Sequence, residues 1–119
     1  MVSGKKVLIV DDNVDAADLT ADYLRVFGAH VSVAYGGSEA LIAARTVFPD
    51  VVFLDIGMPG VDGYHVAKAL RADGRFNNVK IIALTAWGDT DSREKSKAAG
   101  FDLHLTKPAD LSTLVKLAI

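Results

Sequence analysis

The sequence predicts a doubly wound α/β fold, in which helices cover both faces of a five-stranded parallel sheet. Short apolar runs recur along the chain, and segments with helical periodicity separate them. Continuous apolar runs are typical of strands covered on both faces. Regular alternation of strand and helix indicates a parallel sheet built from right-handed crossovers. No repeat, linker or low-complexity tract interrupts this alternation, so residues 1–119 are expected to form one domain.

Five strands are predicted where apolar residues are concentrated. They lie at residues 7–10, 31–34, 51–54, 81–84 and 103–105, where the sequence reads VLIV, VSVA, VVFL, IIAL and LHL. The runs at 31–34 and 103–105 are the weakest, because a polar residue interrupts each of them. Parallel strands place their carboxyl ends at one edge of the sheet, so residues that follow these strands are expected to meet there.

The first helix is predicted after residue 13. Val14, Ala17, Ala21 and Leu24 recur at steps of three and four residues, which places them on one face of a helix. Gly28 then supplies the kind of residue at which helices commonly end.

Capping residues predict the next two helices. Ser38 is expected to cap a helix that runs to about Val47, before Pro49. The Asp62-Gly63 pair is expected to start a third helix. The apolar positions predicted for that helix are Val66, Ala69 and Leu70.

Two more helices are predicted in the last third of the chain. Asp91 with Glu94 three residues later resembles a capping box, and Gly100 is expected to end the helix that begins there. Residues 110–118 form the fifth and shortest pattern.

Composition is typical of a soluble globular protein. Half of the residues are hydrophobic and 24% are charged. No apolar run approaches the ~20 residues that a membrane span requires, and the start MVSGKK is not that of a secretory signal peptide. The net charge of -2 offers no electrostatic footprint for nucleic acid, and the chain has no cysteine. A cytoplasmic protein without membrane or nucleic-acid contacts of its own is therefore expected.

Polar residues follow four of the predicted strands. Asp11 and Asp12 follow the first, Asp55 the third, Thr85 the fourth and Lys107 the fifth. Three carboxylates at one edge repel one another by about 4 kcal/mol per pair at about 4 Å and an effective dielectric near ~20. A cation is needed to offset this repulsion. Few protein oxygens, with water completing the coordination shell, suit Mg²⁺ better than Ca²⁺.

At these strand ends the sequence resembles a known family. VDDN, FLDIGMPGVDGY, ALTA and LTKP, in this order, resemble the receiver domain of two-component response regulators over nearly the whole chain. The resemblance implies a flavodoxin-like fold with strand order 2-1-3-4-5. The combination of DIGMPGVDGY with ALTAWGD and AGFDLHLTKPAD is most similar to receivers attached to hybrid sensor histidine kinases.

The resemblance also implies the chemistry of the site. Asp55 is the expected phosphoacceptor, whose carboxylate attacks the phosphorus of a phosphohistidine. Asp12 and Asp55 are expected to ligate Mg²⁺ together with the backbone carbonyl of Gly57, while Asp11 acts mainly through metal-bound water. Lys107 is expected to pair with Asp55 at rest and with a phosphoryl oxygen after transfer. The Thr85 hydroxyl binds another phosphoryl oxygen.

Further residues near this edge have two interpretations each. The resemblance makes His104 a switch residue that turns inward when Thr85 moves, but it is equally readable as a partly buried structural side chain. Trp87 and Gly57 correspond to positions that line the path of the hydrolytic water, although Trp87 could simply cover a helix end. The Lys107-Pro108 bond is expected to be cis, as in the family. Asp11 or Asp12 could serve only as a helix cap.

The chain has two histidines besides His104. His30 and His65 lie far apart in the pattern and are predicted to be surface residues rather than metal ligands.

The predicted function is a signalling module rather than an enzyme with turnover. A histidine kinase or a histidine phosphotransfer domain is the expected partner, and a monomer or weak phosphorylation-dependent dimer is expected. A haloacid dehalogenase-type phosphatase needs Asp-x-Asp-x-Thr or Val after the first strand, where this chain reads DDNVD. A flavodoxin-like flavin protein is disfavoured because acids after that strand repel the flavin phosphate. A degenerate receiver used only as an interaction surface is the third alternative.

Overall fold

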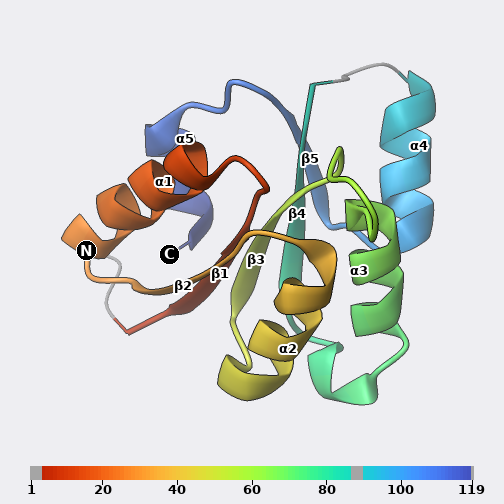
Figure 1. Cartoon of the computed structure of the whole chain (residues 1–119), viewed down its shortest axis with the longest axis horizontal. Helices are drawn as coiled ribbons and strands as arrows, with labels where there is room; N and C mark the ends of the chain where they lie inside the picture. The colour runs from red at the N-terminus through yellow and green to blue at the C-terminus, as the bar shows by residue number, and fades with distance from the viewer. Residues whose placement is uncertain (1–3, 87–89, 119) are drawn as a thin grey trace.

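The computed structural model describes residues 4–86 and 90–118, in which strands and helices alternate along the chain (Figure 1). The strands are β1 (Lys6–Val10), β2 (His30–Ala34), β3 (Val51–Asp55), β4 (Lys80–Thr85) and β5 (Leu103–Thr106). The α-helices are α1 (Val14–Val26), α2 (Gly37–Val47), α3 (Gly63–Arg71), α4 (Thr90–Ala99) and α5 (Leu111–Ala118). All neighbouring strands are parallel, in the order β2-β1-β3-β4-β5. The predicted doubly wound fold and strand order are confirmed.

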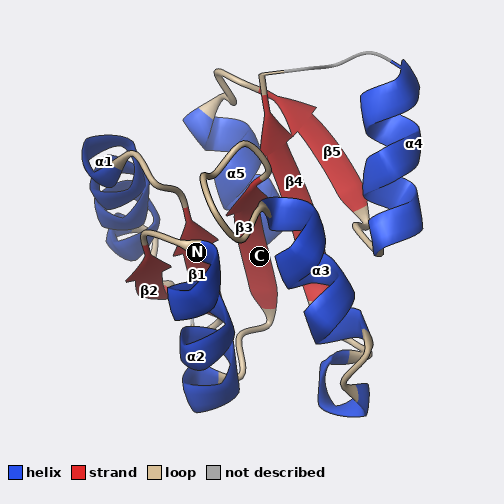
Figure 2. Ribbon diagram, turned by 45° about the vertical axis from the view of Figure 1, so that its right-hand side comes forward, coloured by secondary structure: helices blue, strands red, loops and turns tan. Residues whose placement is uncertain are grey.

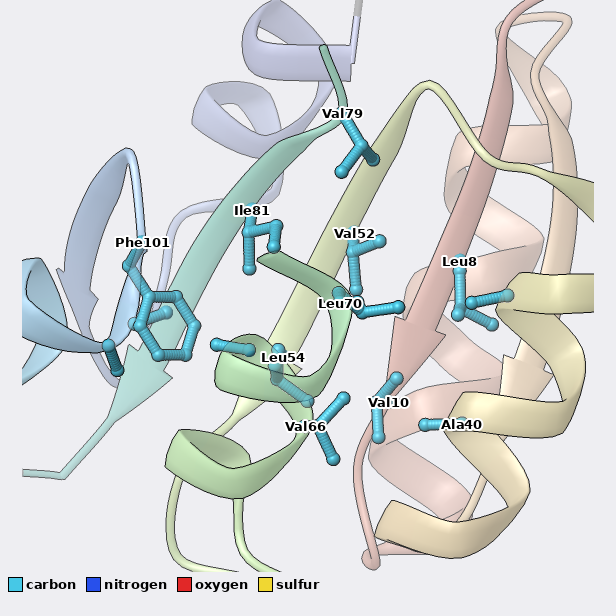
Figure 3. Close-up of a cluster of buried hydrophobic side chains, with 14 of the residues drawn as sticks. Leu8, Val10, Ala40, Val52, Leu54, Val66, Leu70, Val79, Ile81 and Phe101 are labelled. Atoms are coloured by element: carbon cyan, nitrogen blue, oxygen red, sulfur yellow. The ribbon is translucent and has the colours of Figure 1, made fainter. Parts of the chain in front are cut away.

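Helices cover both faces of the sheet (Figure 2). Successive strand residues point to opposite faces, so each central strand contributes to two apolar clusters. One cluster packs α2, α3 and the end of α4 against residues such as Leu8, Val52 and Ile81 (Figure 3). The other packs α1 and α5 against residues such as Ile9 and Phe53. Because both faces are covered, the central strands are apolar along nearly their whole length.

Most helix boundaries lie where the sequence places them. Asn13 caps α1, and its side-chain oxygen accepts a hydrogen bond from the Ala16 amide at 3.1 Å. Asp62 caps α3 in the same way. Gly28 and Gly100 follow α1 and α4 with φ angles of 94° and 100°, a left-handed conformation that glycine adopts readily. Within the described residues, no helix is long and apolar enough to cross a membrane.

Two predicted helix starts are wrong. The cap of α2 is Gly36, so Ser38 lies inside the helix. This earlier start is possible because Gly37 fits closely against Val61, where a side chain would not. Asp91 also lies inside its helix, since α4 already includes Thr90.

The helical faces differ from the prediction at two positions. Val14 is 47% exposed, because it opens α1 before the helix packs on the sheet. In α3 the fully buried alanine is Ala67 rather than Ala69, because Ala67 continues the stripe that begins at Gly63. The short 3₁₀ helix η1 (Gly74–Phe76) was not predicted, and it buries Phe76 against the core.

β2 forms one edge of the sheet. The His30 amide donates to the Lys5 carbonyl and the Ala34 carbonyl accepts from the Asp11 amide, so these alternate residues face β1. The backbone of Val31 therefore faces outward. The Arg25 guanidinium, from the end of α1, donates to the outward Val31 carbonyl at 2.9 Å.

Arg71 lies at the end of α3, on the side of the sheet where the strands begin, opposite their carboxyl ends. It connects several elements there. Its guanidinium donates to the carbonyls of Gly100 and Phe76, each at 2.9 Å, and to the Asp102 carboxylate at 2.8 Å. The same carboxylate accepts a hydrogen bond from the Ile81 amide at the start of β4. One side chain thus connects α3, η1, the end of α4 and the approach to β5.

Candidate functional site

Three carboxylates meet at the carboxyl edge of the sheet. Asp11 follows β1, and its side chain accepts a hydrogen bond from the Asn13 amide at 2.9 Å. Asp55 is the last residue of β3. Asp11, Asp12 and Asp55 each offer an oxygen within 4.8 Å of the other two. Asp11 and Asp55 are buried, each 6% exposed, whereas Asp12 is exposed.

Lys107 lies between two of these carboxylates. Its Nζ is 3.3 Å from Oδ2 of Asp11 and 3.4 Å from Oδ1 of Asp55. The Lys107 amide donates to the Thr85 carbonyl at 2.7 Å, which extends the β4–β5 pairing and fixes the backbone there. The contact with Asp11 was not predicted, since the pattern suggested Asp55 alone. The Lys107-Pro108 bond is cis, as expected.

The buried position of Asp55 disfavours its charge. Burial, reinforced by the neighbouring Asp11 carboxylate, raises the pKa of Asp55 to about 6, although the Lys107 ammonium and the Gly57 amide act in the opposite direction. The Gly57 amide donates to Oδ1 of Asp55 at 3.1 Å. Burial alone lowers the pKa of Lys107, but the facing Asp55 and Asp11 carboxylates outweigh it and raise that pKa.

This pKa predicts a pH-dependent stability that Asp55→Asn removes. The folded state holds the Asp55 proton more tightly than the unfolded state, whose pKa is near the ordinary 3.8. Without Mg²⁺, this residue therefore subtracts stability as the pH rises from about 4 to 6. The free energy of unfolding of Asp55→Asn minus that of the parent should grow across this window and level off above it. A difference that is flat with pH in denaturant titrations contradicts the raised pKa.

The residues fit a magnesium ion. All of the side-chain donors are carboxylate oxygens, the ligand type that this hard cation prefers. Exposed Asp12 leaves space for water, which Mg²⁺ retains in its coordination shell. Gly57, two residues past Asp55, is also exposed and offers a backbone carbonyl on the same loop.

Thr85 and His104 lie on one face of the sheet. Thr85 is 1% exposed at the end of β4, and it pairs in register with Thr106, two residues beyond His104. Side chains two residues apart on a strand share a face, so Thr85 and His104 are diagonal neighbours. His104 is half-buried, with Nδ1 3.0 Å from Oγ of Ser96 on α4. Trp87 lies outside the described residues.

The remaining candidates are accounted for by the fold. Asn13, and neither Asp11 nor Asp12, caps α1. Its place directly after the paired acids was the sequence signal for this cap. His30 and His65 are exposed, as predicted. His65 contacts Asp62 at the start of α3, with 3.0 Å between Nδ1 and Oδ1.

A family model described as response regulator receiver domain matches residues 7–119. The chain belongs to this family. Receiver domains are phosphoacceptor signalling domains of two-component systems, and this membership decides against the phosphatase and flavin-protein alternatives.

Named relatives agree with this assignment. The receiver is 42% identical over 114 residues to the transcriptional regulatory protein PrrA of Mycobacterium leprae, covering 96% of this chain and 48% of that protein. The chain thus spans about half the length of this curated relative. Among solved structures, chemotaxis protein CheY4 of Vibrio cholerae has a TM-score of 0.91 at 31% identity, over 97% of this chain and 96% of that chain.

A second solved structure allows a comparison with a receiver from a kinase, the class to which the sequence was expected to be most similar. The receiver domain of a signal transduction histidine kinase from Syntrophus aciditrophicus has a TM-score of 0.86 at 26% identity. The match covers 96% of this chain and 86% of that chain. Similarity therefore extends to receivers from transcriptional, chemotaxis and kinase proteins, and it is not specific to hybrid kinases.

Proposed function

We propose that this receiver accepts a phosphoryl group on Asp55 from a histidine kinase or a histidine phosphotransfer domain. The observation that carries the proposal is the position of Asp55. It is a buried carboxylate at a strand end, 3.4 Å from a lysine ammonium and grouped with two further carboxylates. A nucleophile, a fixed cation and a set of metal-binding oxygens are together what in-line phosphoryl transfer requires.

In this proposal an Asp55 oxygen attacks phosphorus while the phosphorus–nitrogen bond of the donor phosphohistidine breaks. The donor imidazole leaves with the bonding electron pair and takes up a proton. Lys107 then exchanges its contact with Asp55 for a phosphoryl oxygen, and the Thr85 hydroxyl donates to another. Asp12, Asp55 and the Gly57 carbonyl would hold Mg²⁺, with Asp11 acting through water. The ion would neutralise the charge of the carboxylates and the phosphoryl oxygens.

The output of the switch is assigned to Thr85 and His104. Their shared face means that movement of Thr85 toward a phosphoryl group changes the space next to His104. His104 also contacts Ser96, so the change can reach α4. Trp87, close to Thr85 in sequence, is proposed to take part in the same switch.

The proposal also covers turnover, location, oligomeric state and the protein to which the domain is attached. The domain is proposed to be a module without turnover, cytoplasmic, and monomeric or weakly dimeric after phosphorylation. Attachment to a hybrid sensor kinase remains a hypothesis, supported by the structural similarity to a kinase receiver. We propose that this domain does not itself bind nucleic acid, because its net charge is -2.

A phosphodonor experiment tests the proposed function. Incubation with acetyl phosphate and Mg²⁺ should add a single phosphate, which intact mass spectrometry detects as a gain of about 80 Da. Chelation of Mg²⁺ should suppress the gain. If neither acetyl phosphate nor a phosphorylated histidine phosphotransfer domain modifies the protein, the chain is a degenerate receiver and the proposal fails.

A further inference from the structure

Gly37, the first residue of α2, lies directly against the loop that joins β3 to α3. A Cβ atom at Gly37 would be 2.7 Å from both Cβ and Cγ1 of Val61, and closer still to the Val61 carbonyl oxygen. Contacts under 3.0 Å are essentially never seen for real Cβ atoms. Because Gly37 is part of a helix, the requirement for glycine is spatial rather than conformational.

The same loop contains the residues that directly follow Asp55. Ile56 and Met58 are buried, which fixes the start of the loop in the core. At its other end, the Gly63 amide donates to the Ile56 carbonyl at 3.2 Å. A Cβ at Gly63 would lie 2.6 Å from the Asp55 carbonyl oxygen, so α3 also starts in close contact with the site.

A displacement of Val61 must be taken up where the loop is not buried in the core. Its exposed glycines, Gly57 and Gly60, are the points of least resistance, because they have no side chain to hold them. Gly57 also donates its amide to the Asp55 carboxylate. A displacement of Val61 that is taken up at Gly57 changes the hydrogen bond that orients Asp55.

We propose that Gly37 is a positioning residue for the phosphorylation site. By leaving space for Val61, α2 sets the course of the β3–α3 loop, and with it the Gly57 backbone and the Asp55 carboxylate. This inference rests on the proposed function, since it concerns Mg²⁺ binding and phosphoryl transfer at that site. It extends the functional site to a helix that contributes none of the proposed site residues.

The test compares Gly37→Ala with Gly36→Ala. The second variant is a matched control, because a Cβ at Gly36 meets only Oε1 of Glu39, at an ordinary 3.8 Å. For Gly37→Ala, Mg²⁺ affinity from NMR titration should fall roughly tenfold, as for other disturbances of the groups that support a metal site. The amide shift of Gly57 should change even without metal. The rate of phosphorylation by acetyl phosphate should fall too, while Gly36→Ala matches the parent in all three.

A purely structural role for Gly37 predicts a different outcome. Thermal stability would fall while Mg²⁺ affinity and the Gly57 shift stayed at the parental values, and that result overturns the proposal. If Gly37→Ala does not fold, Val61→Ala replaces it, because it removes Cγ1, one of the Val61 atoms that meet α2, and leaves the helix unchanged. It should weaken Mg²⁺ binding several-fold, and an unchanged affinity is equally decisive against the proposal. A parent protein that binds no Mg²⁺ contradicts the proposed function instead.

Discussion

Asp55→Asn is expected to give a folded protein that takes up no phosphate from acetyl phosphate in the presence of Mg²⁺. The amide has nearly the shape of the carboxylate but lacks the anionic oxygen that attacks phosphorus. Because the carboxylate is buried with its pKa raised to about 6, removing its charge should leave the fold intact or stabilise it. Intact mass spectrometry should show the gain of about 80 Da in the parent and none in the variant.

Two neighbouring variants make this test specific. Asp12→Asn keeps Asp55 and should slow phosphorylation through weaker Mg²⁺ binding, without abolishing it at high Mg²⁺ concentration. Lys107→Ala should still accept phosphate, because Lys107 offsets charge but supplies no atom to the new bond. If Asp55→Asn still gains phosphate and the label maps to Asp11 or Asp12, the nucleophile has been assigned to the wrong carboxylate.

Arg71→Ala is expected to give a large loss of stability. It removes three hydrogen bonds from one guanidinium and deprives the Gly100 and Phe76 carbonyls of their charged donor. Partly buried hydrogen bonds of this kind, with a small discounted contribution from the exposed Asp102 pair, together suggest a loss of about 3 kcal/mol in the free energy of unfolding. Denaturant titration measures this directly.

Arg75→Ala is the control for Arg71→Ala. Arg75 also makes an ion pair, 2.7 Å from Asp73, but its side chain is 59% exposed, compared with 22% for Arg71. Surface pairs contribute little because water screens them, so its loss should be much smaller. Arg71→Lys should not restore stability, since one ammonium cannot replace a planar group with three correctly directed donors. Equal losses of stability for Arg71→Ala and Arg75→Ala would show that the hydrogen bonds of Arg71 are unimportant for stability.

The sequence predicted those parts of the fold that depend on periodicity and on chain order. Apolar runs located all five strands, and glycine and aspartate located the ends of α1 and α4 and the start of α3. It failed where the decisive contact lies between residues distant in the chain. Ser38 is a better cap by local preference than Gly36, yet α2 begins at Gly37, which has no side chain to clash with Val61.

The candidate site, too, was predicted only in part. The strand ends placed Asp11, Asp12, Asp55 and Lys107 together, because parallel strands end at one edge. The depth of burial that raises the pKa of Asp55 could not be read from the sequence, since it depends on how the helices and loops cover the edge. The second contact of Lys107, with Asp11, likewise depends on side-chain geometry that residue order does not specify.

The hydrogen bond from Arg25 to the outer edge of β2 has a consequence for how molecules of this protein meet one another. An uncovered edge strand invites pairing with a strand from another molecule, which is the usual route to aggregation of β-sheets. By occupying the Val31 carbonyl, the guanidinium removes an acceptor that an incoming strand needs and places a hydrated positive charge in its path. Crowded copies of this domain are thereby hindered from extending one another's sheets through β2 at Val31.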